Sequence, residues 1–94
     1  MDTERYRFTV SGRVQGVAFR YTCRDEAERL GLTGWVRNLR DGRVEGEYQG
    51  DPEKCRQMAA WLKDGPPMAR VDHLHVEASS VRDGETGFDI RLTE

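Results

Sequence analysis

Hydrophobic and polar residues alternate along residues 6–11, where every second side chain is apolar. This period of two is typical of a half-buried strand, and Gly12 marks its end. Farther along, four apolar residues recur at spacings of four, four and three, while charged residues fill the opposite face. These apolar residues are Phe19, Cys23, Ala27 and Leu30. The spacing predicts a helix with one buried face, and Gly31 suits its end.

Two further strands are predicted on either side of a tight turn. Residues 33–37 form the first, and the Asp-Gly pair at 41–42 is the strongest short turn signal in the chain. In the strand that follows, Val44, Gly46 and Tyr48 share one face. These segments together predict a β-hairpin.

The second half of the chain contains another helix pattern and then returns to strands. Asp51 followed by Pro52 indicates a helix N-cap and first helical position. The apolar stripe of this helix consists of Cys55, Met58, Ala59 and Leu62. Glycine and prolines at 65–67 end the helix. A fourth strand is expected around residues 74–76, and alternation over residues 88–92 predicts a strand that runs to the end of the chain.

The predicted order of elements is β-α-β-β-α-β, in which the last strand region can be split into two strands. This order is typical of the α+β ferredoxin-like sandwich, where two helices lie on one face of an antiparallel sheet, here of four to five strands. We expect residues 1–94 to form a single domain of this kind. Strands one and two then run in the same direction, with strand three between them. Their carboxyl ends, near Gly12 and Asn38, are expected to meet at one edge of the sheet.

Composition and charge narrow the classes of function. The chain has 15 Lys and Arg against 17 Asp and Glu, which gives a net charge of −2. This near balance argues against a nucleic-acid-binding surface, which usually shows a basic excess on one face. No stretch approaches the roughly 20 apolar residues of a membrane span. The first residues also lack the basic start and apolar run of a secretory signal. We therefore expect a cytoplasmic protein with no nucleic-acid and no membrane partner.

Two cysteines, Cys23 and Cys55, fall on the apolar stripes of the two predicted helices. Small buried thiols are the expected state in a cytoplasmic chain. A disulfide between the helices and a nucleophilic cysteine are the alternatives. A nucleophile is disfavoured because neither cysteine has a histidine nearby in the sequence that would lower a thiol pKa.

The segment from Gly12 to Arg20 has the composition of an anion-binding loop. It leaves a strand and enters a helix, and the glycines at 12 and 16 let backbone N–H groups approach a ligand closely. The start of the helix adds N–H groups without helical partners and the positive end of the helix dipole. Arg20 adds a planar fork of donors that matches phosphate oxygens. The alternative is a structural connection whose arginine pairs with a nearby carboxylate.

Two stretches of sequence carry a family resemblance. Residues 10–20 read Val-Ser-Gly-Arg-Val-Gln-Gly-Val-Ala-Phe-Arg and resemble the first signature of the acylphosphatases, position for position. Residues 34–44 read Gly-Trp-Val-Arg-Asn-Leu-Arg-Asp-Gly-Arg-Val, with Gly50 six residues later, and resemble the second. The chain also has the length and element order of that family, so the resemblance covers essentially all of it.

The resemblance implies an enzyme that hydrolyses the carboxyl-phosphate bond of acyl phosphates to a carboxylate and inorganic phosphate. It implies that Arg20 binds the phosphate and that Asn38 orients the attacking water. It further implies that backbone N–H groups cradle the phosphoryl oxygens, namely those of Arg13, Val14, Gln15, Gly16, Val17 and Ala18. No metal and no cofactor is implied, and a monomer is expected.

One departure from the family is visible near the end of the chain. Such chains commonly carry an aromatic residue after the arginine of the last strand, whereas Leu92 follows Arg91 here. We interpret this as a difference in packing that bears on local stability more than on activity.

Three other functions are compatible with parts of the pattern. A non-catalytic domain that binds acyl or carbamoyl phosphate would use the same cradle, although both Arg20 and Asn38 are present. RNA-recognition modules share the β-α-β-β-α-β plan, but they stack bases on strand aromatics, and residues 44–48 are acidic with one aromatic. A phosphatase for monoesters would need an acid to protonate a poorer leaving group, and neither signature supplies one.

Several other residues have both a functional and a plainer interpretation. His73 and His75 could begin a metal site, but no third ligand is suitably spaced, so we expect surface histidines. Arg37 and Arg40 could steer an anionic substrate or be solvated charges beside the hairpin, and the sequence leaves both open. Trp35 and Trp61 could be binding aromatics, but each fits an apolar stripe, so we expect both in the core.

Overall fold

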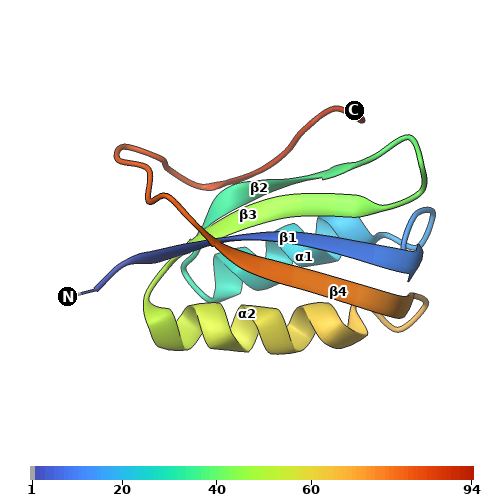
Figure 1. The fold of residues 1–94 in the computed structure, drawn as a ribbon, viewed down its shortest axis with the longest axis horizontal. Coiled ribbons are helices and arrows are strands. Elements are labelled where there is room, and N and C mark those ends of the chain that lie inside the picture. Colours follow the sequence, from blue (N-terminus) through green and yellow to red (C-terminus); the bar gives the residue numbers. More distant parts are fainter. Residues whose placement is uncertain (1) are drawn as a thin grey trace.

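Seven elements follow one another in the predicted order, with the last strand region split in two (Figure 1). The computed structural model describes residues 2–94, and Met1 lies outside them. The strands are β1 (Glu4–Arg13), β2 (Thr33–Asn38), β3 (Val44–Gly50), β4 (Arg70–Ser79) and β5 (Phe88–Ile90). The helices are α1 (Phe19–Arg29) and α2 (Pro52–Asp64). The α+β ferredoxin-like fold is confirmed.

The strands of residues 2–94 form one five-stranded sheet in the order β4-β1-β3-β2-β5. The pairs β1–β3, β1–β4 and β2–β3 are antiparallel, so β1 and β2 run in the same direction as expected. β5, however, pairs with β2 in parallel, and the sheet is mixed where a purely antiparallel one was predicted. The cause is the connection of residues 80–87, which carries the chain from the β4 edge to the opposite edge. There β5 runs alongside β2 in the same direction.

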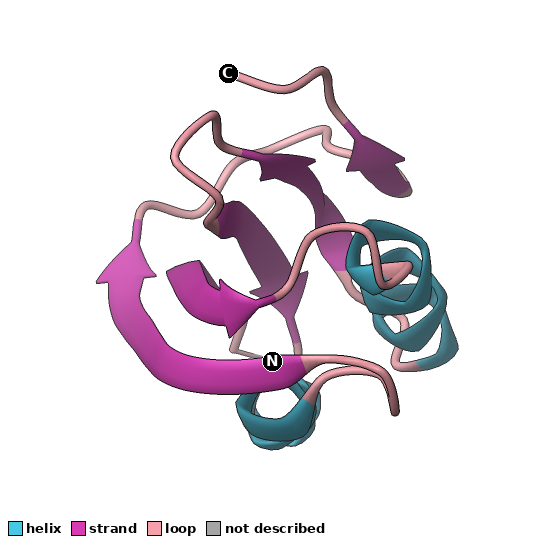
Figure 2. Cartoon of the chain, turned by 90° about the vertical axis from the view of Figure 1, so that its right-hand side faces the viewer, coloured by secondary structure: helices cyan, strands magenta, loops and turns pink. Residues whose placement is uncertain are grey.

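Both helices cover one face of the sheet, and a single hydrophobic core lies between the two layers (Figures 1 and 2). The helices bury the apolar stripes that predicted them, with Cys23 and Ala27 from α1 and Met58 and Leu62 from α2. Opposite them lie side chains of the sheet, namely Phe8, Val10, Val36, Val44, Tyr48 and Phe88. The predicted N-cap of α2 is also confirmed, because the Asp51 carboxylate accepts the backbone N–H of Glu53 at 3.0 Å.

The chain after β5 follows β2 without continuing as a strand. Alternation was expected to extend through Leu92, but β5 ends at Ile90 and Leu92 is 90% exposed. Burial against the core ends with Ile90. The backbone N–H groups of residues 91 and 94 still donate to carbonyls of β2, at 2.9 and 3.1 Å. The tail is therefore fixed by backbone hydrogen bonds rather than by apolar side chains.

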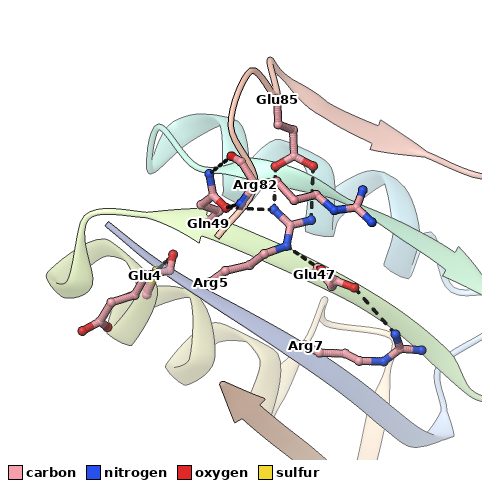
Figure 3. Close-up of polar contacts among 8 residues, drawn as sticks. Glu4, Arg5, Arg7, Glu47, Gln49, Arg82 and Glu85 are labelled. Carbon is pink, nitrogen blue, oxygen red and sulfur yellow. Dashed lines mark hydrogen bonds and ion pairs between the residues drawn. The ribbon is translucent and has the colours of Figure 1, made fainter. Parts of the chain in front are cut away.

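The face of the sheet that the helices leave open carries a network of buried charges (Figure 3). Arg5 of β1 is only 1% exposed, and its Nη1 and Nη2 donate to the two carboxylate oxygens of Glu85, at 2.8 and 3.2 Å. Its Nε donates to Glu47 of β3. Gln49 adds two hydrogen bonds of 2.8 Å with the backbone of Arg82. Because Arg82 and Glu85 belong to the β4–β5 connection, the network fastens that connection to the sheet.

The hydrogen bonds of this network shift the pKa values of Arg5 and Glu85. Burial alone would lower the pKa of Arg5, but its hydrogen bonds to Glu85 and Glu47 outweigh that effect and raise it. The hydrogen bond from Arg5 in turn holds the pKa of Glu85 below its ordinary value. Both groups therefore stay charged at neutral pH.

Both cysteines are buried and free, which confirms the interpretation as small core thiols and excludes the disulfide alternative. Burial raises the pKa of the Cys23 thiol, and it raises the pKa of Cys55 to about 11. Such thiols are protonated at neutral pH and are poor nucleophiles.

Candidate active site

The loop after β1 and the β2–β3 hairpin lie at the same end of the sheet, on the right of Figure 1 and facing the viewer in Figure 2. They meet because β1 and β2 run in the same direction and end at Arg13 and Asn38. Between them is a pocket of about 320 Å³. It is lined by Val14, Gln15, Gly16, Ala18, Phe19, Arg20, Tyr21 and Asn38. The structure thus brings Asn38 together with Arg20 and most of the predicted loop.

Two predicted cradle residues do not line the pocket. Arg13 ends β1 with an exposed side chain. Val17 is partly buried and packs against the core. Their predicted part in the cradle concerns backbone N–H groups only, and it stays a prediction.

The backbone of the loop has left-handed conformations at three positions. Gly12 has φ 121° at an irregularity in the β1–β4 pairing, and a Cβ there would collide with the carbonyl oxygen of Arg70. Gly16 has φ 74°. Ala18 has φ 61° and is the one non-glycine residue with positive φ among residues 2–94. This conformation costs a residue with a Cβ about 1–2 kcal/mol, and strain of this kind concentrates at functional sites.

α1 begins directly after Ala18 without a side-chain cap from residues 2–94. The backbone N–H groups of its first turn are therefore left to a ligand or to solvent. The carbonyl of Ala18 accepts both the hydroxyl and the backbone N–H of Thr22, at 2.8 and 3.1 Å. These bonds hold the start of the helix against the loop.

Arg20 is in the first turn of α1 and is partly exposed. Within residues 2–94 its guanidinium has no carboxylate within ion-pair distance. The alternative that this arginine merely pairs with a neighbouring carboxylate is therefore wrong. A guanidinium with unpaired donors at a pocket wall can bind an anion.

Gln15 connects the loop to the hairpin, a role that the sequence did not predict. Its Nε2 donates to the carbonyl oxygen of Leu39 at 2.7 Å and to that of Arg43 at 2.9 Å. The hairpin is itself closed by a 2.8 Å bond from the Leu39 N–H to the Arg43 carbonyl. The one feature of the sequence that points to this role is the amide side chain, whose N–H₂ group offers two hydrogen-bond donors. The resemblance assigned Gln15 only a backbone role.

Asn38 is the last residue of β2, and its side chain is partly exposed at the pocket. Its backbone carbonyl accepts the N–H of Glu94 at 3.1 Å, and the carbonyl of Glu94 accepts the N–H of Arg40 at 3.0 Å. The main chain of Asn38 is thus held on its outer side. Its side-chain amide has no hydrogen-bond partner within residues 2–94, which leaves both its donor and its acceptor for a ligand.

The remaining candidates do not line this pocket. Arg37 donates to Glu45 at 2.7 Å on the open face of the sheet, so it is a structural charge there, while Arg40 is exposed. His73 and His75 are exposed on edge strand β4, as expected. Within the part of the chain that is described, no three His, Cys, Asp or Glu side chains gather as a metal site would require. No helix there is long and apolar enough to cross a bilayer.

The side chains of both tryptophans pack against other residues away from the pocket lining. Trp61 packs against the core, with its ring centroid 5.5 Å from that of Phe19. Trp35 is buried on the opposite face of the sheet, where the guanidinium groups of Arg37 and Arg91 lie 4.8 and 4.3 Å from its ring. Neither lines the pocket of Arg20 and Asn38.

Comparison with known proteins gives one consistent result. The acylphosphatase family model matches residues 6–90. An acylphosphatase of Rubrobacter xylanophilus is 49% identical over 89 residues, which are 95% of this chain and 81% of that protein. An acylphosphatase of Anaeromyxobacter dehalogenans is 50% identical over 91 residues, which are 97% of this chain and 98% of that protein. The structure of an acylphosphatase from Coxiella burnetii superposes with a TM-score of 0.91 at 41% identity, covering 96% of this chain and 94% of that one.

Proposed function

This chain belongs to the acylphosphatase family and has acylphosphatase activity, and we propose that Arg20 and Asn38 are the residues that carry out the reaction. The observation that supports this assignment is their shared pocket. Arg20 comes from the start of α1 and Asn38 from the end of β2, and both line it together with the glycine-bearing loop. The substrate class implied by the family is an acyl phosphate, R–CO–O–PO₃²⁻.

In this proposal, Arg20 and the loop before α1 bind the phosphate group of the substrate. The guanidinium offers a planar fork to two phosphoryl oxygens, and backbone N–H groups of residues 13–18 and the first turn of α1 donate to the rest. A hydrogen bond to a charged group contributes about 1.5–3 kcal/mol. The left-handed conformation of Ala18 fixes the direction of the backbone where the loop enters α1.

Asn38 orients the water that attacks phosphorus. Its neutral amide cannot take a proton at neutral pH, but its carbonyl oxygen can accept one hydrogen bond from the water. The water oxygen forms the new bond to phosphorus, and the bond from phosphorus to the acyl oxygen breaks, with its electron pair leaving on the carboxylate. The proton of the water passes to a phosphoryl oxygen of the substrate, which gives a carboxylate and inorganic phosphate. Positioning and charge stabilisation are the main requirements of such a step.

The proposal also covers the oligomeric state, the domain organisation, the location in the cell and the need for a cofactor. We infer that residues 1–94 form one domain, and that the protein is a cytoplasmic monomer that needs no metal or organic cofactor. The single core between the sheet and both helices supports the one-domain part of this inference. Size-exclusion chromatography with light scattering tests the monomer.

The proposal is tested by following the ultraviolet absorbance of benzoyl phosphate with the wild-type chain, with Arg20→Ala and with Arg56→Ala. Arg56 is a matched control, because it is an arginine exposed on α2 that does not line the pocket. We expect rapid, chelator-resistant loss of benzoyl phosphate, little cleavage of p-nitrophenyl phosphate, and a severe loss of kcat/KM in Arg20→Ala only. Binding of benzoyl phosphate without turnover by the wild type would instead indicate a binding domain. A loss on chelation that a divalent ion restores would overturn the metal-free part.

A further inference from the structure

One side chain of the active-site pocket has no part in the mechanism above. The pocket is lined by loop residues, by two buried core residues and by the pair Arg20 and Asn38. The side chain that remains is Tyr21, which is 52% exposed although it is a large aromatic. A surface tyrosine needs no explanation by itself, but this one forms part of the wall beside Arg20.

The ring of Tyr21 lies within cation–π distance of two guanidinium groups. The guanidinium carbon of Arg20 lies 5.8 Å from the ring centroid, and that of Arg24 lies 5.5 Å from it. Both distances are within the range of cation–π attraction, about 6 Å. Arg24 is three residues after Tyr21 in α1, so the two side chains lie on the same side of the helix. The ring is therefore positioned next to the guanidinium that is to bind the phosphate.

The chemistry of the substrate determines what reaches this ring. In an acyl phosphate a single bridging oxygen separates phosphorus from the acyl carbon. If Arg20 binds the phosphoryl end, the acyl group must begin within the immediate surroundings of that guanidinium. The pocket has no other exposed aromatic side chain among residues 2–94. Because Tyr21 is half exposed, a flat aromatic group can pack against the part of its ring that the two guanidinium groups leave open, whereas a methyl group has far less area to offer.

We propose that Tyr21 binds the acyl group of the substrate and makes acyl phosphates with an aromatic acyl group better substrates than those with a short aliphatic one. This inference rests on the proposed function, because it places the acyl group by way of the phosphate bound at Arg20. It assigns Tyr21 a part in specificity that the two signatures do not contain.

Tyr21 could instead act only through Arg20, by holding the guanidinium in position. The two roles predict different results. A residue that contacts the acyl group changes the ratio between substrates with different acyl groups. A residue that only positions Arg20 changes the turnover of all acyl phosphates equally and weakens inhibition by inorganic phosphate as well.

The test compares kcat/KM for benzoyl phosphate and acetyl phosphate in the wild type, Tyr21→Ala and Tyr21→Phe, with inorganic phosphate as a competitive inhibitor. We expect the benzoyl-to-acetyl ratio to fall about three- to tenfold in Tyr21→Ala. It should stay within about twofold of wild type in Tyr21→Phe, because the ring is retained. The inhibition constant of phosphate should also stay within about twofold, since the acyl group is not part of that ligand.

Two results would overturn the inference in distinguishable ways. If the wild type hydrolyses both substrates and Tyr21→Ala has the same benzoyl-to-acetyl ratio as the wild type, the role of Tyr21 is overturned and the proposed function stands. A wild-type chain that hydrolyses neither substrate would overturn the proposed function and this inference with it. Because Tyr21 is half exposed, its truncation opens no core cavity, and far-ultraviolet circular dichroism verifies that each variant is folded.

Discussion

The side-chain amide of Gln15 donates a 2.7 Å hydrogen bond to the backbone carbonyl of Leu39. Gln15 belongs to the loop that is to bind phosphate, and Leu39 directly follows Asn38. The bond therefore joins the two halves of the proposed active site across 24 residues of sequence. Together with the 2.9 Å bond to Arg43, it sets how far the loop lies from the hairpin. Catalysis by positioning depends on such distances, because small displacements of the reacting groups reduce the rate strongly.

Gln15→Leu removes both bonds while it keeps a side chain of similar size. We expect kcat/KM for benzoyl phosphate to fall about tenfold or more, and the free energy of unfolding to fall by about 1–2 kcal/mol. Gln57→Leu on the exposed side of α2 is the control and should change neither quantity appreciably. Steady-state kinetics and urea unfolding measure the two effects. Wild-type kinetics in Gln15→Leu would show that the hairpin keeps its position without this link.

The fold was predictable from the sequence wherever a local residue pattern is compatible with only one local structure. The period-two pattern before Gly12, the Asp-Gly turn at 41–42 and the Asp51-Pro52 cap each specify a local structure, and each is found. The parallel pairing of β5 was not predictable, because a three-residue strand contains no signal for its partner. The exposure of Leu92 was missed for a related reason: apolar alternation continues in the sequence after the core has ended.

The residues of the candidate site and of the charge network also differ in how far the sequence predicts them. Some belong to a recognisable sequence pattern, and others have a role only through contacts with distant residues. That Arg20 and Asn38 line one pocket was predictable, because β1 and β2 run in the same direction and end at the same edge of the sheet. The side-chain role of Gln15 depends on carbonyls 24 and 28 residues away. The burial of Arg5 depends on Glu85, which is 80 residues away. Neither contact leaves a periodic trace in the chain, so neither could be predicted from it.

Glu85→Gln tests the charge network on the open face of the sheet. The hydrogen bond from Arg5 lowers the pKa of Glu85 in the folded state, so its stabilising effect is present above the unfolded value of about 4.3. That effect is lost as the pH falls through the lowered folded pKa. We expect the variant to be less stable by about 1–2 kcal/mol at pH 7, with the difference shrinking toward zero in acid.

Thermal or urea unfolding from pH 7 to pH 2.5 measures this effect. Glu53→Gln is the control, because Glu53 pairs with Arg56 on the exposed surface of α2, and we expect a change of about 0.5 kcal/mol or less there. Stability curves for the wild type and Glu85→Gln that run parallel over the whole pH range would rule out this contribution of Glu85.

Ala18→Gly tests the strain at the entrance to α1. Glycine adopts φ 61° without a steric penalty, and the relief should exceed the entropic cost of a glycine in the unfolded chain. We expect the free energy of unfolding to rise by about 0.5–1 kcal/mol. Ala60→Gly, at an exposed position inside α2, should lower it by about 1 kcal/mol. A loss of stability in both variants would show that Ala18 is not strained.

The two thiols provide a test of the core. Burial raises the pKa of Cys23, and that of Cys55 to about 11. At pH 7.5 the reactive thiolate is therefore scarce, and both sulfurs are shielded from reagent. We expect the native chain to react with Ellman's reagent at least about 100-fold more slowly than the chain unfolded in guanidinium, which exposes both thiols. Rapid release of one equivalent from the native chain would contradict the burial of that cysteine.

The assignment of the active site is tested most directly by the kcat of Asn38→Ala on benzoyl phosphate, measured together with the inhibition constant of inorganic phosphate. If Arg20 and the loop bind the phosphate while Asn38 orients the water, kcat falls about 10²–10³-fold, and the inhibition constant stays within about threefold of wild type. A kcat close to wild type would contradict the role of Asn38. An equal loss of phosphate binding would show that Asn38 belongs to the cradle instead.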